Sequence, residues 1–282
     1  MNDKNLPTIV VVGAAGGIGK QVALQLQSRA QVVAVVQNPT QMTEVSSLAM
    51  HCVECDLSDA GSVQQTIDSI NANCRNGIDG LVFCAAMQPV GPLELISRGE
   101  MEKLFAINVF GTMQLVQGLI PALRLTRGRI VLFSSMAGRV ASPMLGAYSG
   151  SKFALEGLAD ALRRELCLSG VSLSLVEPGG VDTPMAAAQG ALVEQAFARL
   201  DTESAKRYGR LLRGYKALTE AGMRHSSTPA AVARVAVDAV AGPGKPKARY
   251  VAGKDAKLLI RLAGWLPTRW LDALLMKLTL GK

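Results

Sequence analysis

The sequence predicts an α/β fold in which a doubly wound parallel β-sheet is flanked by helices on both faces. Three observations indicate it: short β-branched runs alternate with amphipathic segments, a glycine-rich turn follows the first run, and aliphatic residues far outnumber aromatic ones. Hydrophobic residues make up 49% of the 282 residues and aromatic residues 4%, which is typical of parallel strands buried on both faces. Because no repeat or low-complexity linker divides the chain, residues 1–282 are predicted to form a single domain.

Seven short apolar runs, each bounded by turn residues, are predicted to be strands. They lie at 8–12, 31–36, 50–55, 80–86, 128–135, 171–180 (including the loop that leaves the strand) and 248–253. Between these runs, apolar residues at helical spacing predict helices. The helices are expected at 19–29, 59–70, 97–124 with an interruption near Asn108, 148–166 and 230–240. Strands that alternate with helices in this way form parallel sheets.

Two segments near the C-terminus depart from this alternation. Residues 185–225, called the lid here, are predicted to form two helices that cover a substrate. Residues 254–282, called the tail, are predicted to be amphipathic and carry Trp265 and Trp270. From residue 243 onward, nine Lys or Arg residues face two Asp residues, so this part of the chain holds +7 of the net charge of +8.

The place of the positive charge decides between classes of partner. Because the basic residues gather at the C-terminus and not along a groove, nucleic acid is not expected as a partner. A basic amphipathic tail instead favours contact with a membrane surface, and its packing on the domain or on a neighbouring subunit is the alternative. No uninterrupted run of 18 apolar residues occurs, so no membrane-spanning helix is predicted.

The cysteines and the N-terminus indicate the compartment. Five cysteines, an odd number in a chain of this length, are typical of a reducing compartment and hence of a cytoplasmic protein. Cys52 and Cys55 form a C-x-x-C motif, but on a strand this spacing turns them to opposite faces, so no metal site is predicted. The N-terminus leads at once into an apolar run and glycines, which predicts a first strand and not a signal peptide.

A glycine-rich turn, VVVGAAGGIG, follows the first predicted strand. Gly13, Gly16, Gly17 and Gly19 fit G-x-x-x-G-x-G or G-x-x-G-x-x-G, but not the common G-x-G-x-x-G. Glycines let the chain turn sharply and let a pyrophosphate approach the N-terminus of the next helix, so this position predicts dinucleotide binding. After the second strand, Gln37 stands where a carboxylate would select NAD. The cofactor is therefore NADP or NAD, with NADP favoured.

Six motifs in matching order and spacing resemble those of the short-chain dehydrogenase/reductase family over residues 8–252. They are the glycine turn, an acidic residue after the third strand, an Asn in the long helix, a Ser that ends the fifth strand, a Tyr-x-x-x-Lys pair and a Pro-Gly-x-x-x-Thr segment. The residues that carry them are Gly13, Gly17, Gly19, Asp56, Asn108, Ser135, Tyr148, Lys152, Pro178, Gly179 and Thr183. The resemblance implies a Rossmann-type fold and an NAD(P)-dependent oxidoreductase.

The resemblance also implies a role for each catalytic residue. Tyr148 would be the general acid/base, and Lys152 would lower its pKa and bind the nicotinamide ribose. Ser135 would hydrogen-bond the substrate oxygen, and Asn108 would hold a water that connects Lys152 to solvent. A free Tyr has a pKa of about 10, so a neighbouring ammonium and a cationic oxidised nicotinamide are both needed to favour the phenolate.

The resemblance further implies which residues contact the cofactor, with Asp56 holding the adenine amino group. The expected set is Gly13, Gly16, Gly17, Ile18, Gly19, Gln37, Asp56, Leu57, Ala85, Ala86, Lys152, Pro178, Gly179, Val181 and Thr183. Two departures from the family pattern bear on cofactor affinity: Val12 replaces a Thr, and Phe83-Cys84-Ala85-Ala86 replaces Asn-Asn-Ala-Gly. An apolar contact between the two strands is expected to replace the polar one, and Ala86 to crowd the cofactor.

Two other functions are open. An extended-type sugar-nucleotide epimerase or dehydratase fits G-x-x-G-x-x-G, but the interval of thirteen residues from Ser135 to Tyr148 and the PGGVDT segment argue against it. A non-catalytic NAD(P)-binding regulatory protein fits the altered 83–86 segment, but all four catalytic residue types are present. Family members with a similar lid and tail resemble steroid, retinol and other lipid-type dehydrogenases. A bulky hydrophobic alcohol or ketone is therefore the expected substrate, in a homodimer or homotetramer paired through 104–124 and 149–168.

Overall fold

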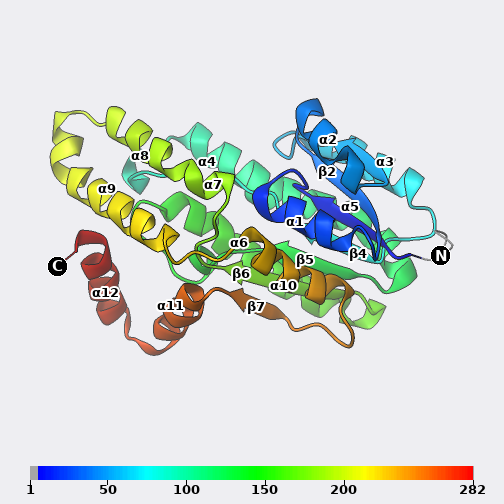
Figure 1. Ribbon diagram of the computed structural model, residues 1–282. Coiled ribbons are helices and arrows are strands. Elements are labelled where there is room, and N and C mark those ends of the chain that lie inside the picture. The colour runs from blue at the N-terminus through cyan, green and yellow to red at the C-terminus, as the bar shows by residue number, and fades with distance from the viewer. Residues whose placement is uncertain (1–5, 282) are drawn as a thin grey trace.

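The computed structural model describes residues 6–281 and contains one seven-stranded sheet in which all neighbouring strands are parallel (Figure 1). The strands are β1 (Thr8–Val12), β2 (Gln31–Val36), β3 (His51–Glu54), β4 (Gly80–Phe83), β5 (Arg129–Phe133), β6 (Ser172–Pro178) and β7 (Arg249–Ala252). Their order across the sheet is β3-β2-β1-β4-β5-β6-β7. The chain thus reverses its direction of winding between β1 and β4, and the predicted doubly wound α/β fold is confirmed.

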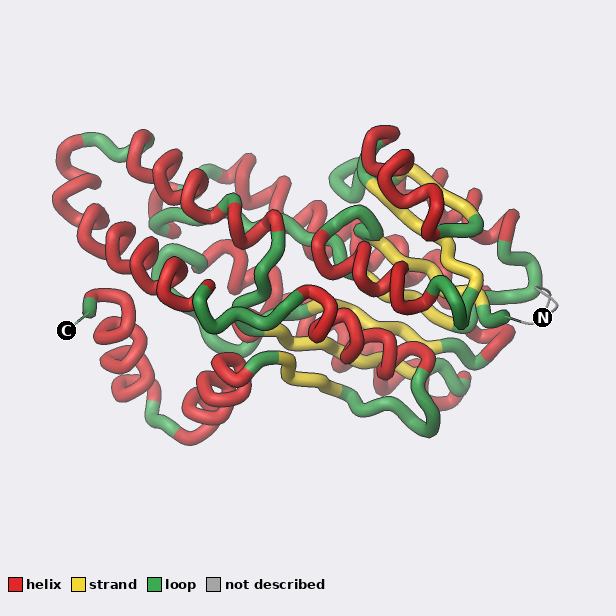
Figure 2. The backbone as a smooth tube through the Cα atoms, in the orientation of Figure 1, coloured by secondary structure: helices red, strands yellow, loops and turns green. Residues whose placement is uncertain are grey.

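Helices cover both faces of the sheet and form its two outer layers (Figures 1 and 2). One face is covered by α1 (Gly17–Leu26), α2 (Pro39–Val45) and α10 (Pro229–Ala241), the other by α3 (Ala60–Asn73), α5 (Thr112–Thr126) and α6 (Gly146–Glu165). Successive strand residues point to opposite faces. Val10 and Val12 of β1 accordingly belong to one buried cluster, and Ile9 and Val11 to the other. The core is therefore double, with the sheet between its halves.

The long helical segment is interrupted at Asn108, as predicted. α4 (Arg98–Phe105) continues into a π-helical stretch, Ala106–Gly111, and then into α5. By length and mean hydropathy the whole segment Arg98–Thr126 could cross a membrane, although polar residues interrupt its apolar run. Half of its most apolar window is buried inside the domain. Core helices of globular proteins meet the same criteria, so this is weak evidence for a membrane span.

The lid contains three helices where two were predicted: α7 (Pro184–Ala187), α8 (Gln189–Ala198) and α9 (Thr202–Met223). The extra helix, α7, begins where the Thr183 side chain accepts a hydrogen bond from the Ala186 amide and a proline occupies the first turn, a favourable helix start. α8 and α9 enclose a third apolar cluster together with Val90 and Met144. The lid therefore has a small core of its own that attaches it to the body.

The tail forms two helices, α11 (Lys254–Trp265) and α12 (Thr268–Leu280), separated at Leu266–Pro267. Proline disfavours helix in the residue before it, which explains the break. α12 packs on α9 (Figure 1), and a Cβ on Gly214 of α9 would overlap the Thr279 backbone. Lys282, the last basic residue of the predicted tail, lies outside the described residues.

Candidate active site

A cavity of about 820 Å³ lies at the carboxyl ends of the strands. Residues at or just after the ends of β1, β2, β3, β4, β5 and β6 all line it. The lid and the tail supply its remaining walls. In open parallel sheets, ligands bind where the winding reverses, and cavities of this size accept small organic ligands.

The glycine turn forms a cradle at one end of the cavity. Gly13 has a φ of 76°, in the left-handed region that favours glycine, and a Cβ there would lie 2.8 Å from the Ala85 backbone nitrogen. Gly16, the N-cap of α1, has no side-chain capping bond. The first amides of α1 are therefore free of a side-chain acceptor. Such an end of a helix fits the pyrophosphate of a dinucleotide.

Every residue predicted to contact the cofactor lines this cavity. The Asp56 carboxylate accepts hydrogen bonds from the Ser58 amide at 2.8 Å and the Ser58 hydroxyl at 2.6 Å. These bonds hold the pKa of Asp56 below its usual value, so it stays an anion that can accept a further hydrogen bond. The Gln37 amide donates to Oε1 of Gln41 at 2.9 Å. The contacts of these residues with a cofactor stay predictions.

The two strands that depart from the family pattern face each other through apolar side chains. Val12 and Phe83 are partners in the β1–β4 register. Both are buried in the same cluster, and Ala85 packs against it. The expected replacement of a polar contact by an apolar one is therefore present. Burial raises the pKa of the Cys84 thiol, which keeps this residue neutral.

Three of the four predicted catalytic residues meet at the centre of the cavity. Tyr148 and Lys152 lie one turn apart on α6, and Ser135 follows the end of β5. The Lys152 side chain is buried, its Nζ donates to the Phe133 carbonyl at 2.8 Å, and Nζ lies 5.8 Å from the centre of the Tyr148 ring. The Ser135 hydroxyl lies near enough to the Tyr148 phenol to act on its pKa. The arrangement brings a phenol, a hydroxyl and an ammonium to one point.

Burial dominates the protonation of this group. Burial raises the pKa of Tyr148 to about 12, and the Ser135 hydroxyl opposes this only in part. Burial also lowers the pKa of Lys152 to about 8, while Glu156 acts to raise it. With these causes alone the phenol is protonated at neutral pH. The lowering of the Tyr148 pKa by Lys152 and a cationic oxidised nicotinamide stays a prediction.

Asn108 lies behind the cavity and does not line it. Its Nδ2 donates to the Met87 carbonyl at 2.9 Å and to the Ser151 hydroxyl at 3.0 Å, and its Oδ1 accepts from the Met87 amide at 2.8 Å. Ser151 in turn donates to the Tyr148 carbonyl at 2.7 Å. The buried amide therefore joins the segment after β4 to the first turn of α6. The role in holding a water stays a prediction.

Two residues at the cavity escaped the sequence analysis. Asp255, in the first turn of α11, accepts a hydrogen bond from the Gly180 amide at 2.8 Å and so ties the tail to the loop after β6. Tyr215 of α9 is buried and lines the cavity. Its pKa is raised by burial and then by Tyr148, which places the two phenols near each other. Neither residue belongs to a motif, because each reaches the site through helices distant in the sequence.

One face of the tail forms an apolar wall of the cavity. The leucines on it are Leu258, Leu259, Leu262, Leu274, Leu275 and Leu278. Trp265 and Trp270 instead lie at the break between α11 and α12 and are 90% and 70% exposed. The tail therefore packs on the domain, which was one of the two alternatives from the sequence. Its two Trp side chains remain exposed to solvent.

The cysteines are dispersed over the domain. The five cysteines of the described residues are all free thiols. Cys52 and Cys55 contact different core clusters, so they point to opposite faces of the sheet, as the strand spacing predicted. Within residues 6–281 no group of His, Cys, Asp or Glu side chains is arranged to hold a metal ion.

A parallel sheet with a glycine cradle and a Ser–Tyr–Lys group at its switch point defines an oxidoreductase of the nicotinamide-dependent class. Residues 7–193 match the family model described as short chain dehydrogenase. The match covers more than half of the chain. The protein therefore belongs to the short-chain dehydrogenase family.

Individual relatives agree with this assignment. The chain is 39% identical over 178 residues to uncharacterized oxidoreductase YbbO of Escherichia coli K12, a match covering 62% of this chain and 66% of that protein, just under two thirds of its length. It is 31% identical over 278 residues to human retinol dehydrogenase 5, covering 95% of this chain and 87% of the human protein. A short chain dehydrogenase from Burkholderia cenocepacia J2315, solved in complex with NADP, has the same fold, with a TM-score of 0.73, 20% identity, and coverage of 96% of this chain and 98% of that one.

Proposed function

We propose that the protein interconverts a bulky hydrophobic alcohol, primary or secondary, and its carbonyl compound with NADP or NAD, and that Tyr148 is the general acid/base. One observation carries the proposal: a single cavity joins the glycine cradle, the Ser135–Tyr148–Lys152 group and the leucine wall of the tail. A nicotinamide dinucleotide would supply the hydride. The chain supplies the proton at the Tyr148 oxygen.

The protonation state of the site favours carbonyl reduction. A phenol with a pKa of about 12 holds its proton at neutral pH, so it can donate to the oxygen of a carbonyl. Ser135, which lines the cavity together with that phenol, would orient the same oxygen. Oxidation of an alcohol needs the phenolate, which becomes accessible only when a positive charge is added near the ring.

The walls of the cavity support an apolar substrate. Besides the tail leucines, the lid contributes Met185, Leu218 and Met223. Burial of a methylene group from water is worth about 0.8 kcal/mol, so each added methylene that enters the cavity should improve binding about fourfold. Charged small substrates would find little to bind on these walls.

The proposal is tested by titrating the protein with NADPH and NADH in parallel and then assaying ketones of increasing alkyl length with the better cofactor. NADPH is expected to bind more tightly, because no carboxylate at Gln37 repels its additional phosphate. We expect kcat/KM to rise by about fourfold per methylene until the cavity is filled. Turnover of small polar ketones alone would contradict the substrate class. Turnover of nucleotide sugars alone would favour the epimerase alternative, and cofactor binding without turnover would favour the regulatory one.

We further propose that the tail touches the surface of an anionic membrane and that the protein is cytoplasmic. Trp265 and Trp270 are exposed at the break between α11 and α12, and basic residues flank them in the sequence. Indole rings are favourable at the membrane interface, and Lys and Arg attract anionic headgroups. A hydrophobic substrate dissolved in the bilayer would then lie near the cavity.

Fluorescence measures this contact directly, because the chain has only these two tryptophans. We expect their emission to shift to shorter wavelength on adding phosphatidylglycerol vesicles, and the shift to weaken with salt. Cosedimentation of a Trp265→Ala/Trp270→Ala variant should fall, while Leu168→Ala, which alters an equally exposed apolar residue elsewhere, should bind as the parent does. Unchanged emission with anionic vesicles would contradict the contact.

The expected homodimer or homotetramer is also retained as a proposal. The predicted pairing helices expose Phe110, Phe153 and Leu158. Apolar side chains at this surface support pairing of α5 and α6 between two copies of the chain. A monomer in sedimentation velocity would contradict it.

A further inference from the structure

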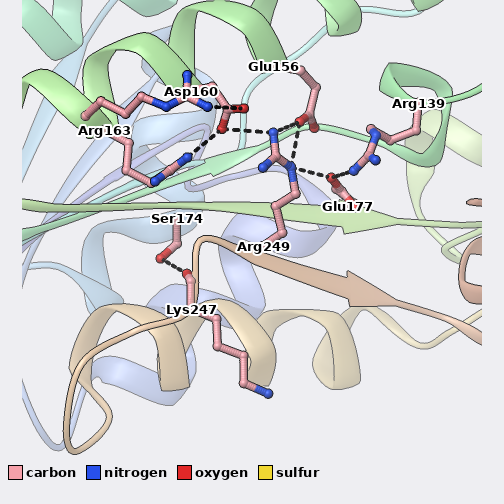
Figure 3. Close-up of polar contacts among 9 residues, drawn as sticks. Arg139, Glu156, Asp160, Arg163, Ser174, Glu177, Lys247 and Arg249 are labelled. Atoms are coloured by element: carbon pink, nitrogen blue, oxygen red, sulfur yellow. Dashed lines mark hydrogen bonds and ion pairs between the residues drawn. The ribbon is translucent and has the colours of Figure 1, made fainter. Parts of the chain in front are cut away.

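A cluster of charged side chains, among them the buried Glu156 and Glu177, surrounds Arg249 (Figure 3). Tyr148, Lys152 and Glu156 follow one another at intervals of four residues on α6, so they share one face of the helix. Glu156 is only 7% exposed. A carboxylate is rarely buried to this extent without a partner of opposite charge.

The partner of Glu156 is Arg249, on the last strand of the sheet. Oε2 of Glu156 accepts from Nε of Arg249 at 3.1 Å and from its Nη2 at 2.9 Å. The same guanidinium also pairs with Asp160 at 3.0 Å and with Glu177 at 3.2 Å. Figure 3 shows the three carboxylates converging on Arg249, with Arg139 beyond Glu177.

The positive charge of Arg249 is therefore shared, and Glu156 is not fully neutralised. Arg139 pairs with Glu177 at 3.0 Å, and Arg163 and Arg164 pair with Asp160. Within residues 6–281, no second cation forms an ion pair with Glu156. Its other oxygen, Oε1, is buried and has no hydrogen-bond partner among the described residues. Negative potential from this oxygen remains inside the domain.

We propose that Glu156 is a positioning residue of the active site: its carboxylate, fixed by Arg249, keeps Lys152 in the charged form that the reaction uses. The inference rests on the proposed function, because it gives Lys152 its role beside Tyr148. Glu156 itself does not touch the cavity, so it acts only through Lys152. The geometry allows this, since the two side chains are one turn apart in a buried region where charges are weakly screened.

The balance of charges around Lys152 supports the proposal. Burial lowers the pKa of the lysine to about 8, and Glu156 is the largest influence that raises it. The remaining charged groups of the cluster pair with one another or with Arg249: Asp160 and Arg163 on α6, Glu177 on β6, and Arg139 after β5. Glu156 is thus the carboxylate that holds the lysine charge near neutral pH.

The test compares the pH dependence of reduction in the parent and in Glu156→Gln. Activity that needs charged Lys152 is present below its pKa and is lost as the pH rises through it. Removing the carboxylate lowers that pKa, so the alkaline limb should move to lower pH by about one unit. At neutral pH, kcat should fall, while KM changes less. Glu156→Asp keeps the negative charge on a side chain that is one methylene shorter. The alkaline limb of its pH profile should therefore lie close to that of the parent.

Asp160→Asn is the matched control. It removes a carboxylate from the same arginine and helix, so it should lower the melting temperature as Glu156→Gln does, but leave the alkaline limb in place. A direct readout is the titration of the Lys152 Nζ signal by nitrogen NMR in the free protein, assigned with Lys152→Arg. This measurement does not need turnover, so it separates failure of this proposal from failure of the proposed function. An alkaline limb and an Nζ titration that both stay unchanged in Glu156→Gln would overturn the proposal. Should that variant not fold, the same result in Glu156→Met, which also removes the charge, would overturn it.

Discussion

Tyr148→Phe is expected to lower turnover by about a thousandfold or more while leaving the dissociation constant of NADPH within about twofold. The substitution removes only the phenolic oxygen, which is the atom that passes the proton. The aromatic ring still fills its place on the first turn of α6, and Lys152 still donates to the Phe133 carbonyl. The loss should therefore appear in kcat. Steady-state assay of ketone reduction and fluorescence titration with NADPH give the two values.

Tyr215→Phe is the matched control, because the cavity contains a second buried phenol near the first. If Tyr148 is the acid, the Tyr215 variant keeps most of its kcat. We expect its KM for the ketone to change, because Tyr215 belongs to the part of the lid that lines the cavity. If the Tyr148 variant retains activity and the Tyr215 variant loses it, then Tyr215 of the lid is the general acid and Tyr148 is not.

Gly19→Ala is expected to cost about 1–3 kcal/mol of stability and to weaken NADPH binding by about a hundredfold. A Cβ at Gly19 would overlap the carbonyl oxygen of Gly13. That carbonyl cannot withdraw easily, because Gly13 is itself in a left-handed conformation and in contact with Ala85. The turn must therefore change shape, and the amides at the start of α1 would no longer point toward the pyrophosphate of the cofactor. Thermal unfolding and NADPH titration measure the two losses.

Gly99→Ala provides the control for glycine replacement in a helix. Gly99 lies in the first turn of α4, and a Cβ there would meet no atom within 4 Å. Its melting temperature should be unchanged or slightly higher, since alanine favours helix over glycine. If Gly19→Ala binds NADPH as tightly as Gly99→Ala does, the glycine turn does not form the cofactor cradle.

The strands and the helices that cover them could be predicted from sequence because their signals are local. Apolar alternation and turn residues depend on neighbours in the chain, and so does the four-residue spacing of Tyr148 and Lys152. The interruption at Asn108 and the opposite faces of Cys52 and Cys55 follow for the same reason. The third lid helix was missed because α7 is only four residues long. Four positions are too few to show the helical spacing of apolar residues from which the other helices were predicted.

The sequence by itself determined the sheet with its two helical layers, the glycine turn and the set of catalytic residue types. Only the tertiary structure decided how those residues act on one another. It placed Asn108 behind the cavity, set Lys152 against the Phe133 carbonyl, and brought Glu156 and Arg249 together from elements 93 residues apart in the chain. The physical reason is that burial and long-range pairing fix the charges of Tyr148 and Lys152, and neither can be obtained from the spacing of residues along one helix.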